Sequence, residues 1–233
     1  KDLATINVHS PIEVSLEDTK LTLQDDTTEK IELFKKLEFK QLLADIDTSS
    51  TNEEVIDKTF EIEQDFQNVD LNDLNEAVIH FELEGTNYLK DTILKFGFYT
   101  NHQHVVINAE DVKDYKHLVQ WLEDKNTTKI VYDAKKTYVS AHRLGINIEN
   151  IEFDVMLASY IIDPSRSIDD VKSVVSLYGQ NYVKDNITIF GKGKKHHIPE
   201  EPILNEHIAS VTEAIAAVTP TMKSQLEDYN QIE

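Results

Sequence analysis

The chain has 233 residues, which is enough for one domain with a full core plus an appendage. It contains no cysteine, which excludes disulfides, thiolate zinc sites and cysteine nucleophiles, and fits a cytoplasmic protein. The 23 Lys+Arg against 43 Asp+Glu give a net charge of -20, whose field repels polyanions, so we expect weak or no DNA binding by the isolated chain.

The first third of the chain differs from the rest. Residues 1–74 hold 7 Lys+Arg against 19 Asp+Glu, a net of -12. Apolar residues near helical spacing predict one amphipathic helix over residues 28–43. The polar, acidic residues 46–75 are predicted to form a linker. No long apolar run indicates a membrane segment, and the start at Lys1 suggests a piece of a longer protein.

The folded domain is expected over residues 76–233. Runs rich in β-formers at 77–84, 91–99 and 102–108 predict three strands of an antiparallel meander. Apolar residues on one helical face then predict a helix over residues 111–124.

A strand–helix alternation follows the meander. Residues 129–132 are predicted to form a short strand, and Asp133 to cap a helix that ends at Gly145. Asp154 is expected to cap a second helix, which Pro164 stops. Strands first and then β-α alternation indicate an α/β domain.

One pair of acidic residues on the first strand could carry chemistry. Glu82 and Glu84 share a strand face because side chains alternate, and adjacent carboxylates can bridge divalent metals. In a chain this acidic, such a pair is also typical of a solvated strand face. The pair alone leaves both interpretations open.

The order of motifs resembles the 3′-5′ exonuclease domain of DNA polymerase I. After the acidic strand come Tyr132-Asp-Ala-Lys-Lys136 and Phe153-Asp-Val-Met-Leu-Ala-Ser-Tyr-Ile-Ile-Asp-Pro164. Gly191-Lys-Gly-Lys194 and Asn205-Glu-His-Ile-Ala209 extend the likeness. The resemblance implies a ribonuclease-H-like fold, a mixed sheet flanked by helices, preceded by a helical and partly extended N-terminal segment.

Residues 1–45 resemble the end of a 5′-nuclease domain, through Lys1-Asp-Leu-Ala-Thr-Ile6, Glu13-Val-Ser-Leu-Glu-Asp18 and the helix that follows. In this family that domain directly precedes the exonuclease domain. The two regions of this chain thus resemble two domains that are neighbours in the family, and they follow one another in the same order. Together they imply an internal fragment of a bacterial DNA polymerase I. The parent protein would be a DNA-directed DNA polymerase, a cytoplasmic enzyme of replication and repair that contacts DNA.

The resemblance also implies that the metal-binding acids are missing. Active members bind two metals through an Asp-x-Glu pair, a helical aspartate and a Tyr-x-x-x-Asp motif. These positions fall on Glu82 and Glu84, on Thr137, and on His207 and Val211. Two carboxylates supply a charge of -2 against +4, so we expect no catalytic metal, no other cofactor and no enzyme activity in this fragment.

Other polar groups have simpler interpretations. Glu213 lies about 200° round a helix from Val211 and should point away from the site. The basic cluster of Lys192, Lys194 and Lys195 could contact phosphate or form a solvated loop. Adjacent side chains diverge on a strand, so the His196-His197 pair is a poor chelator there.

Three functional classes remain after this inspection. The first is a structural domain that connects the 5′ nuclease to the polymerase, as a monomer that touches DNA through the intact enzyme. The second is an acidic docking module for another protein. The third is a residual metal-dependent exonuclease, acting in Mg or Mn through Glu82, Glu84 and an unorthodox third ligand.

Overall fold

The computed structural model describes residues 27–37, 39 and 58–228 of the chain. The chain divides into two compact units, residues 1–52 and 53–233. In the first unit, helix α1 spans Thr27–Lys36 and confirms the expected helix over those residues. The remainder of the segment compared with a 5′-nuclease domain lies outside the described residues.

The second unit is built on one mixed six-stranded sheet, in the order β1-β4-β3-β2-β5-β6. Strands β2, β3 and β4 form the expected antiparallel meander, while β5 and β6 continue the sheet parallel to β2. The strands are β1 Ile62–Glu63, β2 Glu76–Leu83, β3 Ile93–Thr100, β4 Gln103–Asn108, β5 Thr128–Val131 and β6 Ile151–Asp154.

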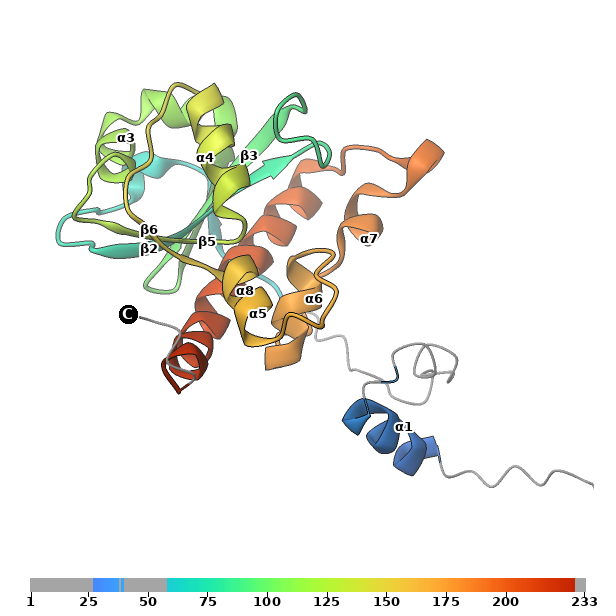
Figure 1. Ribbon diagram of the computed structural model, residues 1–233. Helices are drawn as coiled ribbons and strands as arrows, with labels where there is room; N and C mark the ends of the chain where they lie inside the picture. The colour runs from blue at the N-terminus through green and yellow to red at the C-terminus, as the bar shows by residue number, and fades with distance from the viewer. Residues whose placement is uncertain (1–26, 38, 40–57, 229–233) are drawn as a thin grey trace, which may run out of the picture. The chain divides into compact units, whose positions relative to one another are not determined.

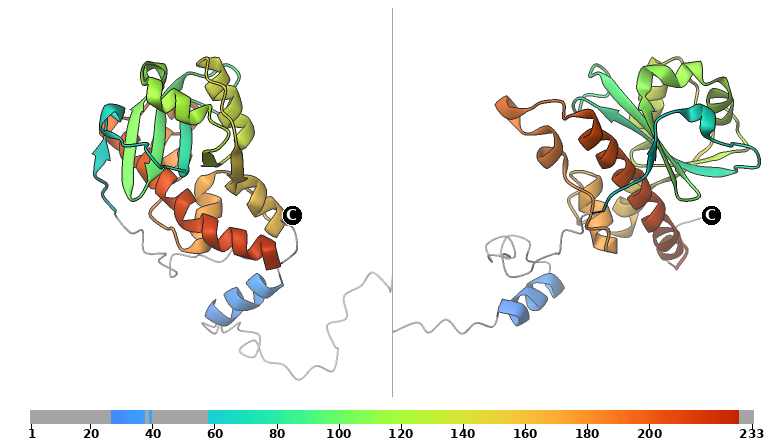
Figure 2. Two further views of the ribbon diagram at one scale, coloured as in Figure 1. Left: turned by 90° about the vertical axis from the view of Figure 1, so that its left-hand side faces the viewer. Right: turned by 180° about the vertical axis from the view of Figure 1, so that it is seen from behind.

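Helices cover both faces of this sheet, as Figures 1 and 2 show. Alternate residues of β2 enter two separate cores: Ile79 and Phe81 pack on the side of α3 and α4, and Val78 on the side of α5, α6 and α8. The helices are α3 Lys116–Leu122, α4 Ala134–Arg143, α5 Val155–Ile162, α6 Val171–Val175, α7 Asn186–Phe190 and α8 Glu201–Asp228. The α/β prediction is therefore confirmed.

A glycine allows the long helix α8 to lie close to the sheet. A Cβ built on Gly97 of β3 would lie 2.4 Å from Cγ2 of Ile208 and 3.1 Å from Cγ2 of Thr212. Only a residue without a side chain leaves room for α8 at this distance. Since α8 carries residues of the candidate site, this close approach sets how near they come to the strands.

The helix starts follow the predicted capping. The Asp133 side chain accepts a hydrogen bond from the backbone N–H of Lys136, and Asp154 caps α5. Asp133 has a φ of 64°, a left-handed conformation that aspartate tolerates better than most residues. The helix expected over residues 111–124 is instead a 3₁₀ segment, Ala109–Asp114, and the helix α3, because the backbone leaves helical geometry at Tyr115.

The structure differs from the sequence prediction over the expected linker, residues 46–75. The described residues from 58 onward belong to the folded unit, because Ile62–Glu63 forms β1 and pairs in parallel with β4. Phe66 is fully buried in the core and packs edge-on against Phe98. The side chains of Phe66 and Val69, both buried, therefore fill specific places in the domain. Further 3₁₀ segments are Phe66–Asn68, Ser176–Tyr178 and Gly193–Lys195.

Candidate functional site

A cavity of about 460 Å³ lies where β2 and β5 end, enclosed by α4 on one side and by α7 and α8 on the other. The carboxyl ends of parallel strands are where open α/β sheets usually bind ligands. Four of the five positions carried over from the exonuclease family line this cavity: Glu82, Glu84, His207 and Val211. The fold thus brings together residues that lie far apart in the sequence.

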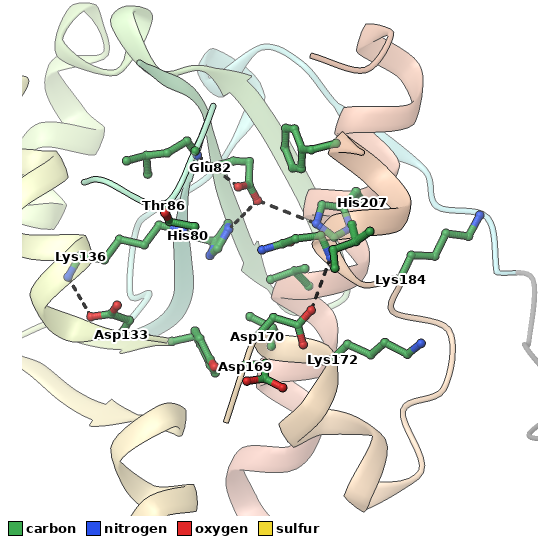
Figure 3. A pocket seen from close by; sticks show the side chains of 18 of the residues that line it. His80, Glu82, Thr86, Asp133, Lys136, Asp169, Asp170, Lys172, Lys184 and His207 are labelled. Atoms are coloured by element: carbon green, nitrogen blue, oxygen red, sulfur yellow. Dashed lines mark hydrogen bonds and ion pairs between the residues drawn. The ribbon is translucent and has the colours of Figure 1, made fainter. Parts of the chain in front are cut away.

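Glu82 is the central charged group of the cavity wall, and it is only 5% exposed. Its Oε2 lies 3.0 Å from Nε2 of His80 and 3.9 Å from Nε2 of His207. Its Oε1 accepts a hydrogen bond from the backbone N–H of Leu83, at 3.1 Å. Figure 3 shows Glu82 between the two imidazoles. Both carboxylate oxygens therefore already have partners within the protein.

The electrostatics of this cluster favour an ionised carboxylate beside neutral imidazoles. Burial raises the pKa of Glu82, but the Lys136 ammonium and the hydrogen bond with His80 outweigh it and lower that pKa overall. Burial lowers the pKa of His80 and of His207, more than Glu82 raises them. Protein groups thus stabilise the negative charge of Glu82.

Glu84 lines the same cavity from a different backbone position. The pairing of β2 with β3 shifts register between Glu82 and Leu83, and the strand ends at Leu83. Glu84 follows the strand and is partly exposed. The two carboxylates share the cavity as expected, but a bulge and a strand end separate them.

Thr137 and Val211 occupy the places where the family resemblance expects acids. The Thr137 hydroxyl is buried and donates a hydrogen bond to the backbone carbonyl of Asp133, 3.0 Å away. Thr137 does not line the cavity, whereas its neighbour Lys136 does. Val211 packs in the apolar cluster that includes Val78 and Ile215. Neither side chain provides a metal ligand.

These residues do not fit a pair of divalent ions. Within the described part of the chain, no group of three or more His, Asp or Glu side chains is arranged to hold a metal ion. The ammonium of Lys136 lies on the α4 side of the cavity, and those of Lys172 and Lys184 on the other side (Figure 3). The charge of Lys136, which lowers the pKa of Glu82, opposes a divalent cation at that carboxylate.

The other acidic residues considered from the sequence have structural partners. Asp154 accepts backbone hydrogen bonds from Asp133 and Ala134 at the start of α4, and from Met156 and Leu157 in α5. Glu213 forms an ion pair with Lys58 and lies 3.3 Å from Nε2 of His104, and it is not among the residues that line the cavity. The prediction that it points away is consistent with this position.

The basic cluster lies on an exposed loop between α7 and α8. Lys192, Lys194 and Lys195 are exposed, and the cavity reaches this loop only through Gly191 and His196. His80 and Lys136 also line the cavity, and neither is among the site residues predicted from the sequence. Strand alternation could have found His80, because it lies two residues before Glu82 and shares its face.

The mixed sheet, the helices on its two faces and the cavity at the strand ends define a ribonuclease-H-like domain of the 3′-5′ exonuclease type. Two solved structures share this fold. Brucella melitensis NrnC matches with a TM-score of 0.61 and 18% identity, over 75% of this chain and 85% of the NrnC chain. Escherichia coli RNase D matches with a TM-score of 0.58 and 11% identity, over 75% of this chain and 47% of the RNase D chain. A family model for the DNA polymerase I, ribonuclease H-like domain matches residues 79–218, and the chain belongs to this family.

Curated relatives match the chain over its whole length. DNA polymerase I of Bacillus subtilis is 32% identical over 100% of this chain and 27% of that protein. DNA polymerase I of Streptococcus pneumoniae R6 is 31% identical over 100% and 26%. The chain thus spans about a quarter of the length of these relatives. None of the described helices is both long and apolar enough to cross a membrane.

Proposed function

We propose that this chain is the exonuclease-like part of a DNA polymerase I and that its role is structural, connecting the 5′-nuclease and polymerase parts without removing nucleotides. In this proposal it acts as a monomeric unit and reaches DNA only through the intact enzyme. The whole protein would be a DNA-directed DNA polymerase of replication and repair.

One observation carries the proposal: Glu82 is hydrogen-bonded to His80, with His207 3.9 Å away and Lys136 nearby, where an active member would present carboxylates to metals. Two-metal hydrolysis needs enough negative charge to hold both cations close together. Here the buried carboxylate is hydrogen-bonded to His80 and its charge is compensated by Lys136, and Thr137 and Val211 add no charge. The family positions therefore supply only the carboxylates of Glu82 and Glu84, which are too few for that mechanism.

The direct test is a time course of single-stranded DNA degradation in Mg²⁺ and in Mn²⁺. We expect no metal-dependent loss of 3′ nucleotides with the natural chain. The double variant Thr137→Asp/Val211→Asp restores two carboxylates at the family positions, and we expect it to gain Mn²⁺ binding and measurable degradation. Calorimetry with Mn²⁺ reports the binding step separately from the cleavage.

The matched control is Thr137→Asn/Val211→Asn, which has nearly the same shape as the aspartate variant but no added charge. We expect it to stay inactive and to bind no Mn²⁺. Activity of the natural chain in Mn²⁺ that disappears in Glu82→Ala would contradict the proposal and would favour a residual exonuclease instead.

A further inference from the structure

The folded unit has a second hollow, of about 570 Å³, whose described lining residues differ from those of the cavity at the strand ends. It lies between α4, the segment that follows this helix and the loop that joins β2 to β3. Ile146 and Ile148 are buried and form its apolar floor, and Val139 is half-buried. Leu89 and Tyr138 flank it and are 65% and 44% exposed. An exposed apolar patch with polar groups at its edge is typical of a site of protein interaction.

Arg143 supplies a fixed positive charge to this hollow. Its guanidinium donates hydrogen bonds to the backbone carbonyls of Tyr88 and Asp91, at 2.8 and 2.7 Å, which hold the side chain in place. Arg143 is nevertheless exposed, and within the described part of the chain no ion pair includes it. A guanidinium carries more N–H groups than these two bonds use, so donors remain for an acceptor from outside. A carboxylate fits such donors in both geometry and charge.

Two carboxylates near the hollow have partners of their own. Asp91 accepts a hydrogen bond from the backbone N–H of Asn87, at 2.7 Å, and Glu123 accepts one from that of Asn147, at 2.9 Å. Neither carboxylate is among the described residues that line the hollow. Charges act over about 8 Å at physiological ionic strength, so Arg143, which lines the hollow, affects a bound ligand more than the distant charges of the chain do.

The surface called here the α4 groove consists of Leu89, Tyr138, Val139, Arg143, Ile146 and Ile148. We propose that it binds a short segment of another protein in which apolar side chains stand beside a carboxylate. The apolar side chains fill the hollow over its floor, and the carboxylate binds the remaining N–H groups of Arg143. Tyrosine and arginine, both present in the groove, are enriched among the residues that contribute most to binding at protein interfaces. The inference goes beyond the proposed structural role, because it concerns a different surface from the cavity.

Other occupants fit the α4 groove less well. A nucleic acid presents a row of phosphates and is held by several cations, whereas one arginine lines the groove. A second copy of the chain would bring a net charge of -20 against an equal charge. The apolar floor and the single fixed cation therefore favour a peptide that is mainly apolar and carries few charges.

The test is fluorescence anisotropy of labelled synthetic peptides with the chain of residues 1–233. The probe peptide has leucine and phenylalanine at its centre and aspartate on both sides. One control peptide replaces the aspartates with lysines, and another replaces the apolar residues with serines. The net charge of -20 attracts the lysine peptide, so nonspecific electrostatic attraction would favour it over the probe, which is the reverse of the order we expect.

We expect the probe to bind at least about tenfold more tightly than either control peptide. Leu89→Ser/Tyr138→Ser removes the exposed apolar side chains of the groove and should weaken binding at least about tenfold. Leu177→Ser/Ile203→Ser is the matched control, because both positions are 50% exposed and lie outside the groove, and it should bind the probe as the natural chain does. Equal binding of the lysine peptide, or undiminished binding by Leu89→Ser/Tyr138→Ser, would overturn the proposal.

The role of Arg143 is tested separately. Arg143→Gln removes the charge and keeps a side-chain donor for the backbone carbonyls, and binding should weaken about fivefold. Because this change also alters the support of the loop, NMR with the natural chain provides an independent readout. We expect the probe to shift the amide signals of Leu89, Val139 and Asn147, and shifts confined to other regions would contradict the proposal. Release of the probe by single-stranded DNA would assign the groove to nucleic acid, and loss of binding as the chain self-associates would assign it to a second copy; both would overturn the proposal.

Discussion

Two buried carboxylates near the ends of the sheet are held in different ways. Asp154, at the end of β6, accepts hydrogen bonds from four backbone N–H groups. Glu82, near the end of β2, has one side-chain hydrogen bond, with His80, and accepts one from a backbone N–H group, that of Leu83. Four backbone partners make Asp154 part of the fold itself, whereas Glu82 depends on a particular side chain, His80, for one of its two hydrogen bonds. The first carboxylate joins two helix starts, and the second lies in the wall of the cavity.

The largest effect is expected at Asp154. Asp154→Ala removes the acceptor for four backbone N–H groups at the start of two helices, and we expect a loss of about 3 kcal/mol in the free energy of unfolding. Urea denaturation followed by circular dichroism measures it. Asp133→Asn is the control, because asparagine also caps helices and tolerates the left-handed φ, and its effect should stay within about 0.5 kcal/mol. Similar losses in both variants would contradict the special role of Asp154.

Gly97 tests the surroundings of Glu82, because it sets the distance between the sheet and α8, the helix that carries His207. In Gly97→Ala the new Cβ would clash with Cγ2 of Ile208, which lies 2.4 Å away. We expect a loss of about 2 kcal/mol in the free energy of unfolding, together with displacement of His207 from Glu82. Denaturation and the NMR signals of the imidazoles measure the two effects. An unchanged stability would show that α8 adjusts freely.

The imidazoles beside Glu82 predict a dependence of stability on pH. The pKa values of His80 and His207 in the folded chain lie below the ordinary 6.5, so folding excludes protons from these rings. Their contribution to stability is complete above pH 6.5 and is lost as the pH falls below that value. Each excluded proton adds a slope of about 1.4 kcal/mol per pH unit.

Urea denaturation at pH 7.5, 6.5 and 5.5 checks this slope. His104, whose pKa burial also lowers, adds to it in the natural chain. His80→Gln should therefore show a shallower loss of stability between pH 6.5 and 5.5, and an identical slope in that variant would argue against neutral imidazoles at the site.

The smallest effect is expected on the basic loop. The triple variant Lys192→Ala/Lys194→Ala/Lys195→Ala changes exposed side chains only, so the free energy of unfolding should change by less than about 0.5 kcal/mol. We propose that any residual contact with phosphate comes from this loop. Fluorescence anisotropy with single-stranded DNA at low salt should then show weaker binding by the variant, and equal binding would place the contact elsewhere.

The contrast between the two carboxylates also explains what the sequence could predict. An aspartate directly before an apolar run is a local signal, so the caps at Asp133 and Asp154 could be predicted, as could the strands of the meander. The cluster around Glu82 joins β2 to α8, and no local pattern states which face of α8 meets the strand. The resemblance to a known family supplied His207 and Val211, but not His80 or Lys136.

The linker prediction for residues 46–75 differs from the structure for a related reason. Its composition is acidic and polar, which is typical of a linker. The structure nevertheless buries Phe66, because the surrounding core residues leave a space that its side chain fills. A large apolar residue in a polar stretch is a weak signal until the surrounding core is known.

The first strand has a practical consequence for dividing this protein into parts. A shortened chain that begins at Glu76 would expose the edge of β4 along which β1 pairs, and would leave empty the space that Phe66 fills. Bare strand edges recruit other chains, and empty core space lowers stability. A shortened version that is meant to stay dispersed in solution should therefore begin at or before Lys58.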